Sequence, residues 1–136
     1  MEPATITAKR ILVVDDEPLV GNSVSMVLGS GGYKVQVTNG GKEALAMLEQ
    51  SEFDLVITDF NMPGMNGDEL ALHLKARWPD MPIIMLTAYA ENLRASETGL
   101  PGVDALISKP FEVAELRLVV AQAFSGRNFQ SPPEQS

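Results

Sequence analysis

The sequence predicts an α/β fold, in which a doubly wound parallel sheet of five strands alternates with five helices. Two observations carry this prediction. Short apolar runs alternate with segments whose apolar residues recur at helical spacing, and this alternation is typical of βαβ units. Three of the runs are almost continuously apolar, as expected of central strands that helices cover on both faces. Right-handed crossovers between parallel strands then place helices on both sides of one sheet.

The apolar runs predict strands at residues 10–14, 34–38, 54–58, 82–87 and 104–108. The second run, KVQVT, differs from the first, third and fourth because apolar and polar residues alternate in it. Alternation is typical of a strand with one exposed face. We therefore expect this strand at an edge of the sheet or half buried.

The segments between and after these runs predict the helices. A fourth helix, at 90–98, has few large apolar residues, whereas the fifth, at 112–124, has the clearest pattern. Glycines in GSGGY end the first helix, and RWPD ends the third. The apolar residues that mark the first three helices are Val20, Val24, Val27 and Leu28; Ala44, Leu45 and Leu48; and Leu70, Ala71 and Leu74.

Length and composition are those of one ordinary domain. The chain has 136 residues, 45% of them hydrophobic and 21% charged. We expect a domain over 10–124, an N-terminal extension over 1–9 and a polar, flexible C-terminal tail over 125–136. There is no cysteine, which fits a reducing cytoplasm and excludes disulfides and thiolate metal sites.

Charge and hydropathy exclude several kinds of partner. The net charge of −8 argues against a broad surface for nucleic acid or for anionic membranes. The N-terminus has no apolar core typical of a signal peptide, and no apolar run approaches the roughly 20 residues of a membrane helix. We expect a cytoplasmic protein with no membrane partner and no direct contact with nucleic acid.

Acidic residues follow the first predicted strand. The stretch ILVVDDEP places Asp15, Asp16 and Glu17 side by side where an apolar run ends. Like charges repel, and two of them about 4 Å apart cost roughly 4 kcal/mol at an effective dielectric near 20. Two explanations stand at this point. The acids either begin a helix, whose positive end favours them, or hold a cation.

Polar groups also follow the third, fourth and fifth predicted strands. Asp59 ends the third, Thr87 ends the fourth and Lys109 follows the fifth. Because the carboxyl ends of parallel strands meet at one edge, these groups should converge with the acids after the first strand. Clustered carboxylates suit a hard cation such as Mg²⁺. A carboxylate beside Mg²⁺, a hydroxyl and a lysine are the groups that phosphoryl transfer requires.

Four motifs resemble, in order and spacing, the receiver domain of two-component response regulators. They are ILVVDDEP, LVITDFNMPGMNGDEL, PIIMLTAYA and ISKPF, and the resemblance runs from about Arg10 to Phe124. It implies a flavodoxin-like (βα)₅ fold and a signalling module, not a turnover enzyme. The module would take a phosphoryl group from a sensor histidine kinase or histidine phosphotransfer protein and lose it slowly by autodephosphorylation. Its output would pass to a downstream protein or a fused output domain, from a monomer or a phosphorylation-dependent dimer.

The resemblance also implies a role for each acid. Asp59 would be the phosphoacceptor. Asp16 and Asp59 would ligate Mg²⁺, or Mn²⁺ in its place, together with the backbone carbonyl of Asn61. Asp15 would act through a metal-bound water.

At the other strand ends, Thr87 would be the switch hydroxyl and Lys109 the partner of the phosphate, with a cis bond between Lys109 and Pro110. The family often has Tyr or Phe two or three residues before the lysine. Leu106 stands there in this chain, so no ring-rotation switch is expected.

The alternative is a phosphatase of the haloacid dehalogenase type, which also forms an aspartyl phosphate. Such an enzyme needs a second acid two residues after the nucleophile, and Asn61 stands at that position.

Two other residues are expected to have structural roles only. His73 should lie on the outer face of the third helix, and Trp78 should pack at its end.

Overall fold

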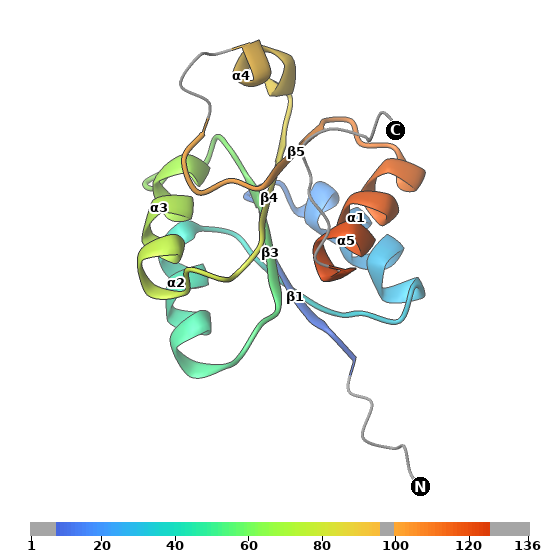
Figure 1. The fold of residues 1–136 in the computed structure, drawn as a ribbon, viewed down its shortest axis with the longest axis horizontal. Helices are drawn as coiled ribbons and strands as arrows, with labels where there is room; N and C mark the ends of the chain where they lie inside the picture. The colour runs from blue at the N-terminus through green and yellow to red at the C-terminus, as the bar shows by residue number, and fades with distance from the viewer. Residues whose placement is uncertain (1–7, 96–99, 126–136) are drawn as a thin grey trace, which may run out of the picture.

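The computed structural model describes residues 8–95 and 100–125. Figure 1 shows strands and helices in strict alternation along the chain. The elements are β1 (Arg10–Val14), α1 (Pro18–Ser30), β2 (Lys34–Thr38), α2 (Gly41–Gln50), β3 (Leu55–Asp59), α3 (Gly67–Arg77), β4 (Ile83–Thr87), α4 (Ala90–Ala95), β5 (Ala105–Ser108) and α5 (Val113–Ser125).

The strands form one parallel sheet in the order β2-β1-β3-β4-β5. This order confirms the predicted doubly wound, flavodoxin-like fold. The alternating strand, β2, lies at an edge as expected, and its residue Val37 is 38% exposed. After β2 the chain returns across β1 to form β3, so the strand order reverses between β1 and β3. A ligand site is expected outside the carboxyl ends of the strands at such a reversal.

Helices cover the two faces of the sheet in pairs. Figure 1 shows α1 and α5 on one side and α2 and α3 on the other, with α4 beyond the sheet at the top of the view. Successive residues of β1 face opposite layers. Ile11 and Val13 pack with α1 and α5, whereas Leu12 and Val14 pack with α2 and α3. Full burial of these residues explains why the first run reads as continuously apolar.

Several boundaries differ from the prediction by one residue, among them the starts of β4 at Ile83 and of β5 at Ala105. β3 begins at Leu55, because Asp54 pairs instead with the start of β1: its backbone N–H donates to the Arg10 carbonyl, and its Oδ2 accepts the Arg10 N–H at 2.8 Å. Helix α5 begins at Val113, one residue later than predicted. Helix α4 is described only over Ala90–Ala95, so the rest of its predicted range lies outside the described residues.

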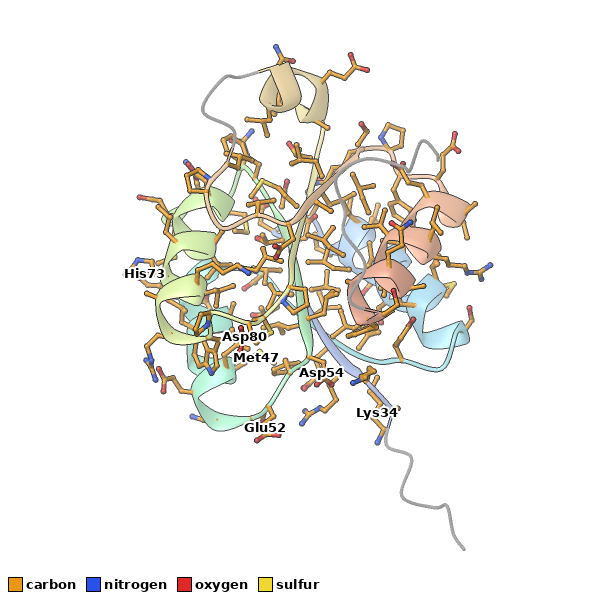
Figure 2. All side chains as sticks on the ribbon, in the orientation of Figure 1. Lys34, Met47, Glu52, Asp54, His73 and Asp80 are labelled. Atoms are coloured by element: carbon orange, nitrogen blue, oxygen red, sulfur yellow. The ribbon has the colours of Figure 1, made fainter. Side chains whose placement is uncertain are left out.

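Two predicted structural residues lie where expected. His73 is exposed and points away from the fold on α3 (Figure 2). Trp78 is half buried at the end of α3, where its ring packs against the core between the sheet and the helices α2 and α3. Among the described residues no helix has the length and apolar character needed to cross a membrane. The predicted extension and tail fall largely outside the described residues.

Candidate functional site

Asp15 occupies the first position after β1 and is 2% exposed. Its backbone N–H donates to the Thr38 carbonyl, which extends the pairing of β1 with β2. Its Oδ1 accepts the backbone N–H of Glu17 at 2.8 Å, so the carboxylate turns back over the start of α1. Its Oδ2 is buried and accepts no hydrogen bond, although the Lys109 Nζ lies 3.2 Å away.

Asp59 is the last residue of β3 and is 6% exposed. Its Oδ1 accepts the backbone N–H of Phe60 at 2.8 Å. The start of α3 lies directly against this strand end, because Gly67 donates its N–H to the Phe60 carbonyl at 2.8 Å. A Cβ at Gly67 would lie only 2.0 Å from the Asp59 carbonyl oxygen. Glycine is therefore required for α3 to begin this close to the acid.

Lys109 joins acids from two segments, the residues after β1 and the end of β3. Its Nζ lies 2.9 Å from Glu17 Oε1 and 3.2 Å from the Oδ2 atoms of both Asp15 and Asp59. The Lys109–Pro110 bond is cis, as the resemblance implied. Burial acts to lower the pKa of Lys109, but the hydrogen bond to Glu17 and the two aspartates outweigh it, and the net shift is upward. The lysine therefore keeps its charge in this site.

Burial raises the pKa of both buried acids, the opposite of its effect on the lysine. It is the largest cause that raises the pKa of Asp15, and the Glu17 N–H and the Lys109 charge oppose it only in part. Burial also raises the pKa of Asp59, and the neighbouring charge of Asp15 raises it further. The pair thus resists ionisation in the absence of a cation beyond Lys109.

Thr87 ends β4 and is 1% exposed. Its Oγ1 accepts the backbone N–H of Tyr89 at 3.0 Å. Its carbonyl accepts the backbone N–H of Lys109 at 2.9 Å, which links the end of β4 to the residue after β5. These bonds fix the hydroxyl at the same edge of the sheet as Asp59.

The groups meet around one pocket of about 320 Å³. The residues that line it are Asp16, Glu17, Asp59, Asn61, Thr87, Ala88, Tyr89 and Lys109. Asp15 does not line the pocket itself but contacts Lys109, which does. The structure therefore brings together every site residue that the sequence predicted. The assignment of a role to each of them stays a prediction.

Glu17 is the site residue that sequence reasoning missed. Among the described residues, the carboxylates placed to hold one metal ion are those of Asp15, Glu17 and Asp59, whose ligand atoms lie within 4.8 Å of one another. Asp16 is exposed and lines the pocket but does not belong to this cluster. Glu17 is also the N-cap of α1, yet its side chain makes no capping hydrogen bond. The acids are therefore not explained as a capped helix start alone.

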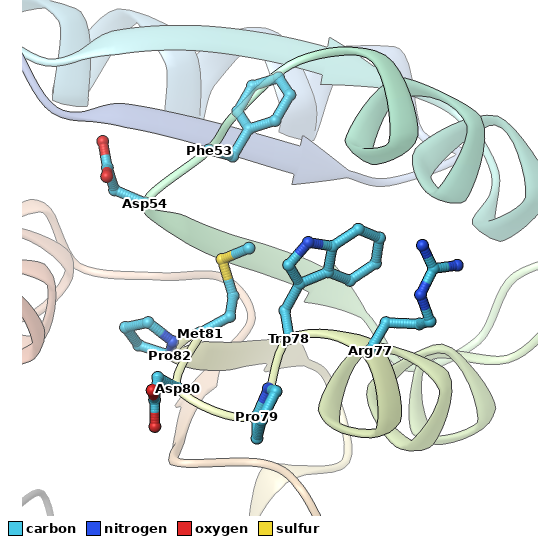
Figure 3. Close-up of a pocket in the computed structure, with 8 residues that line it drawn as sticks. All are labelled: Phe53, Asp54, Arg77, Trp78, Pro79, Asp80, Met81 and Pro82. Atoms are coloured by element: carbon cyan, nitrogen blue, oxygen red, sulfur yellow. The ribbon is translucent and has the colours of Figure 1, made fainter.

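A second pocket, of about 410 Å³, lies near the beginnings of β3 and β4 (Figure 3). Its lining includes Phe53, Trp78 and the carboxylates of Asp54 and Asp80. It contains no lysine and no hydroxyl side chain. The groups for phosphoryl transfer therefore meet only at the first of these two pockets.

Comparison with known proteins gives a consistent family. The sequence model of the response regulator receiver domain matches residues 11–121. Response regulator protein FleR of Pseudomonas aeruginosa is 34% identical over 120 residues, which are 88% of this chain and 25% of FleR. Chemotaxis protein CheY-3 of Vibrio cholerae is 37% identical over 111 residues, which are 79% of this chain and 85% of CheY-3.

Solved structures agree. The crystal structure of response regulator protein TrrA from Thermotoga maritima, in complex with Mg²⁺-BeF, has a TM-score of 0.77 and 36% identity, and the match covers 85% of this chain and 98% of that one. The chain spans about a quarter of FleR and most of CheY-3, so relatives include both long and short proteins.

The haloacid dehalogenase alternative finds no support in the site, because Asn61 replaces the second acid that such phosphatases need. The fold, the acidic site and the match over 11–121 agree with one another. The chain belongs to the response regulator receiver domain family of two-component signalling.

Proposed function

We propose that Asp59 accepts a phosphoryl group from a sensor histidine kinase or a histidine phosphotransfer protein. The phosphorylated chain then changes its contacts with a downstream protein or a fused output domain. The observation that carries this proposal is the pocket in which Asp59, Thr87 and Lys109 meet beside Asp16 and Asn61. These groups come from the ends of separate strands. The parallel sheet brings those ends to one edge, but it does not require an acid, a hydroxyl and a lysine there.

The transfer requires little chemistry beyond positioning. A carboxylate oxygen of Asp59 attacks the phosphorus of a phosphohistidine in line, and a P–O bond forms. The P–N bond breaks, and its electron pair leaves with the imidazole nitrogen. Water later attacks the phosphorus of the acyl phosphate, which restores the Asp59 carboxylate and releases inorganic phosphate.

Lys109 and Thr87 would stabilise the oxygens of the transferred phosphoryl group. The Lys109 Nζ is 3.2 Å from Asp59 Oδ2, so its charge lies beside the position where phosphoryl oxygens would stand. The Thr87 Oγ1 already accepts a hydrogen bond from the Tyr89 N–H. Its hydroxyl proton is then available to donate to a phosphoryl oxygen.

The acid cluster fits a divalent cation. Asp15 Oδ2 is buried without a hydrogen bond, and the carboxylates of Asp15, Glu17 and Asp59 lie within 4.8 Å of one another. Oxygen ligands of this kind suit Mg²⁺, and Mn²⁺ by the same chemistry. Asp16 and Asp59 would hold the ion with the Asn61 carbonyl, and Asp15 would hold it through water. The ion would supply positive charge against the carboxylates and the phosphoryl oxygens.

The Mg²⁺-BeF complex of TrrA supports this assignment by similarity, since beryllofluoride is a phosphoryl mimic. We place the receiver unit at 10–124, with 1–9 and 125–136 as flanking segments, in line with the family match over 11–121. As a signalling module in the cytoplasm, it would act through protein partners and not by turnover of a substrate, as a monomer or a phosphorylation-dependent dimer.

Acetyl phosphate tests this function without knowledge of the kinase. With Mg²⁺ present, intact mass spectrometry should show one added phosphate, and removal of the metal by EDTA should abolish it. Under the same conditions the chain should not turn over a phosphomonoester such as p-nitrophenyl phosphate. Catalytic release of p-nitrophenol without a stable phosphate adduct would contradict the proposal.

A further inference from the structure

Glu17 makes the shortest of the three contacts to the Lys109 ammonium. The Glu17 Oε1 lies 2.9 Å from Nζ, whereas the two aspartate oxygens lie 3.2 Å away. The backbone of Glu17 is held at the start of α1, where its carbonyl accepts the N–H groups of Val20 and Gly21 at 3.1 Å. Its side chain therefore reaches Lys109 from a fixed point.

The three contacts differ in what it costs to break them. The Lys109 ammonium donates a hydrogen bond to Glu17 at 2.9 Å, and the Oδ2 atoms of Asp15 and Asp59 lie 3.2 Å from it as ion pairs. The side chains of Asp15 and Asp59 are 1% and 8% exposed, so loss of Lys109 would leave a buried charge with less compensation. The Glu17 side chain is 60% exposed and can turn to water.

A phosphoryl group on Asp59 needs a donor from Lys109. Since the buried contacts are costly to break, the Glu17 contact is the one that yields. Glu17 also lines the pocket, so its charge repels an anionic group there. Competition for Lys109 and repulsion of the anion therefore both disfavour the phosphorylated state.

We propose that Glu17 is a positioning residue that holds Lys109 in the resting site and competes with the phosphoryl group for it. Glu17 thereby sets how readily the phosphorylated state forms. The inference rests on the proposed function of Asp59. Glu17 belongs to the acid cluster as well, so the same charge that opposes the phosphoryl group attracts a divalent ion.

The variant Glu17→Gln separates these effects, because they predict changes of opposite sign. In isothermal titration calorimetry, Mg²⁺ should bind more weakly to Glu17→Gln than to the parent. At saturating Mg²⁺, beryllofluoride should bind about threefold to fivefold more tightly, the size expected for loss of one exposed ion pair. The control is Glu52→Gln, an exposed glutamate just before β3, and it should change neither affinity.

Glu17→Asp tests the contact itself. Aspartate keeps the charge but is one methylene shorter and does not reach Lys109 from the same backbone position. It should bind beryllofluoride more tightly than the parent, as Glu17→Gln does. If Glu17→Asp matches the parent, charge alone acts and the positioning role is wrong.

Binding of beryllofluoride tests the role of Glu17 separately from the proposed function of Asp59. If the parent binds beryllofluoride with Mg²⁺ but Glu17→Gln binds it equally well, only the role of Glu17 is overturned. If the parent does not bind beryllofluoride at all, both the role of Glu17 and the proposed function are overturned.

Discussion

Lys109 Nζ and Asp59 Oδ2 lie 3.2 Å apart, so an ion pair joins the segment after β5 to the end of β3 across the intervening strand β4. The contact exists because parallel strands deliver their last residues to one edge of the sheet. Even with this lysine beside it, burial and the charge of Asp15 raise the pKa of Asp59. The site therefore stores electrostatic repulsion that a cation or a neutral substitution would relieve.

Asp59→Asn should consequently stabilise the chain when no divalent ion is present. Because the folded-state pKa of Asp59 lies above its ordinary value of 3.8, the folded state binds the proton more tightly than the unfolded state does. The free energy of unfolding of the parent thus falls as pH rises from 3.8 through the raised pKa. Asparagine is neutral throughout, so in EDTA the variant should be more stable than the parent at neutral pH.

Urea unfolding in EDTA at several pH values measures this difference. The advantage of Asp59→Asn should shrink as pH is lowered toward the ordinary pKa of an aspartate. Asp80→Asn, at an exposed carboxylate, is the control and should stay within about 0.5 kcal/mol of the parent. A variant less stable than the parent at neutral pH would show that the Lys109 ion pair outweighs the repulsion.

Asp16→Asn should abolish the rise in melting temperature that millimolar Mg²⁺ produces in the parent. A bound ligand stabilises the folded state by RT ln(1 + [L]/Kd), so loss of a direct ligand removes most of this term. Asp16 lines the pocket but lies outside the acid cluster, so this variant tests Asp16 as a metal ligand and leaves the three clustered carboxylates in place. An unchanged rise in this variant would remove Asp16 from the metal site.

Gly67→Ala should destabilise the chain by about 1–3 kcal/mol, the usual cost of forcing extra atoms into a packed site. Its Cβ would lie 2.0 Å from the Asp59 carbonyl oxygen, so either β3 or the start of α3 must shift. Phosphorylation by acetyl phosphate should slow as well. Gly29→Ala in α1 is the matched control, because its Cβ would meet nothing within 4 Å. Equal stability of both variants would contradict the close approach.

Tyr89→Ala should speed the loss of phosphate if the ring shields the acyl phosphate from water. Tyr89 lines the pocket, although it is 50% exposed. Exclusion of water slows hydrolysis, and a tenfold faster decay would correspond to about 1.4 kcal/mol off the barrier. Leu72→Ala, at an exposed residue of α3, is the control for a lost surface side chain. Unchanged decay with weaker partner binding would make Tyr89 a contact surface instead.

The doubly wound parallel sheet and most of the site followed from simple sequence rules. The alternation in KVQVT predicted that β2 lies at an edge or is half buried, and the polar residues at strand ends predicted the meeting of Asp59, Thr87 and Lys109. These predictions succeed because side-chain periodicity and parallel topology determine them directly.

Finer features depended on side-chain rotation and on pairing between distant segments. Periodicity does not tell which of three consecutive acids turn toward a lysine 92 residues away, so the contact between Glu17 and Lys109 was not predicted. Likewise, the pairing of Asp54 with Arg10 displaced the start of β3 from its predicted position. Both features arise from contacts that no local pattern contains.

The position of the phosphoryl group on the chain decides whether Asp59 is the phosphoacceptor. After treatment with acetyl phosphate and Mg²⁺, borohydride reduces an aspartyl phosphate to homoserine, which peptide mass spectrometry locates. We expect homoserine at position 59 and none in Asp59→Asn treated in the same way. Homoserine at Asp15 or Asp54 in the parent, with aspartate intact at position 59, would contradict it.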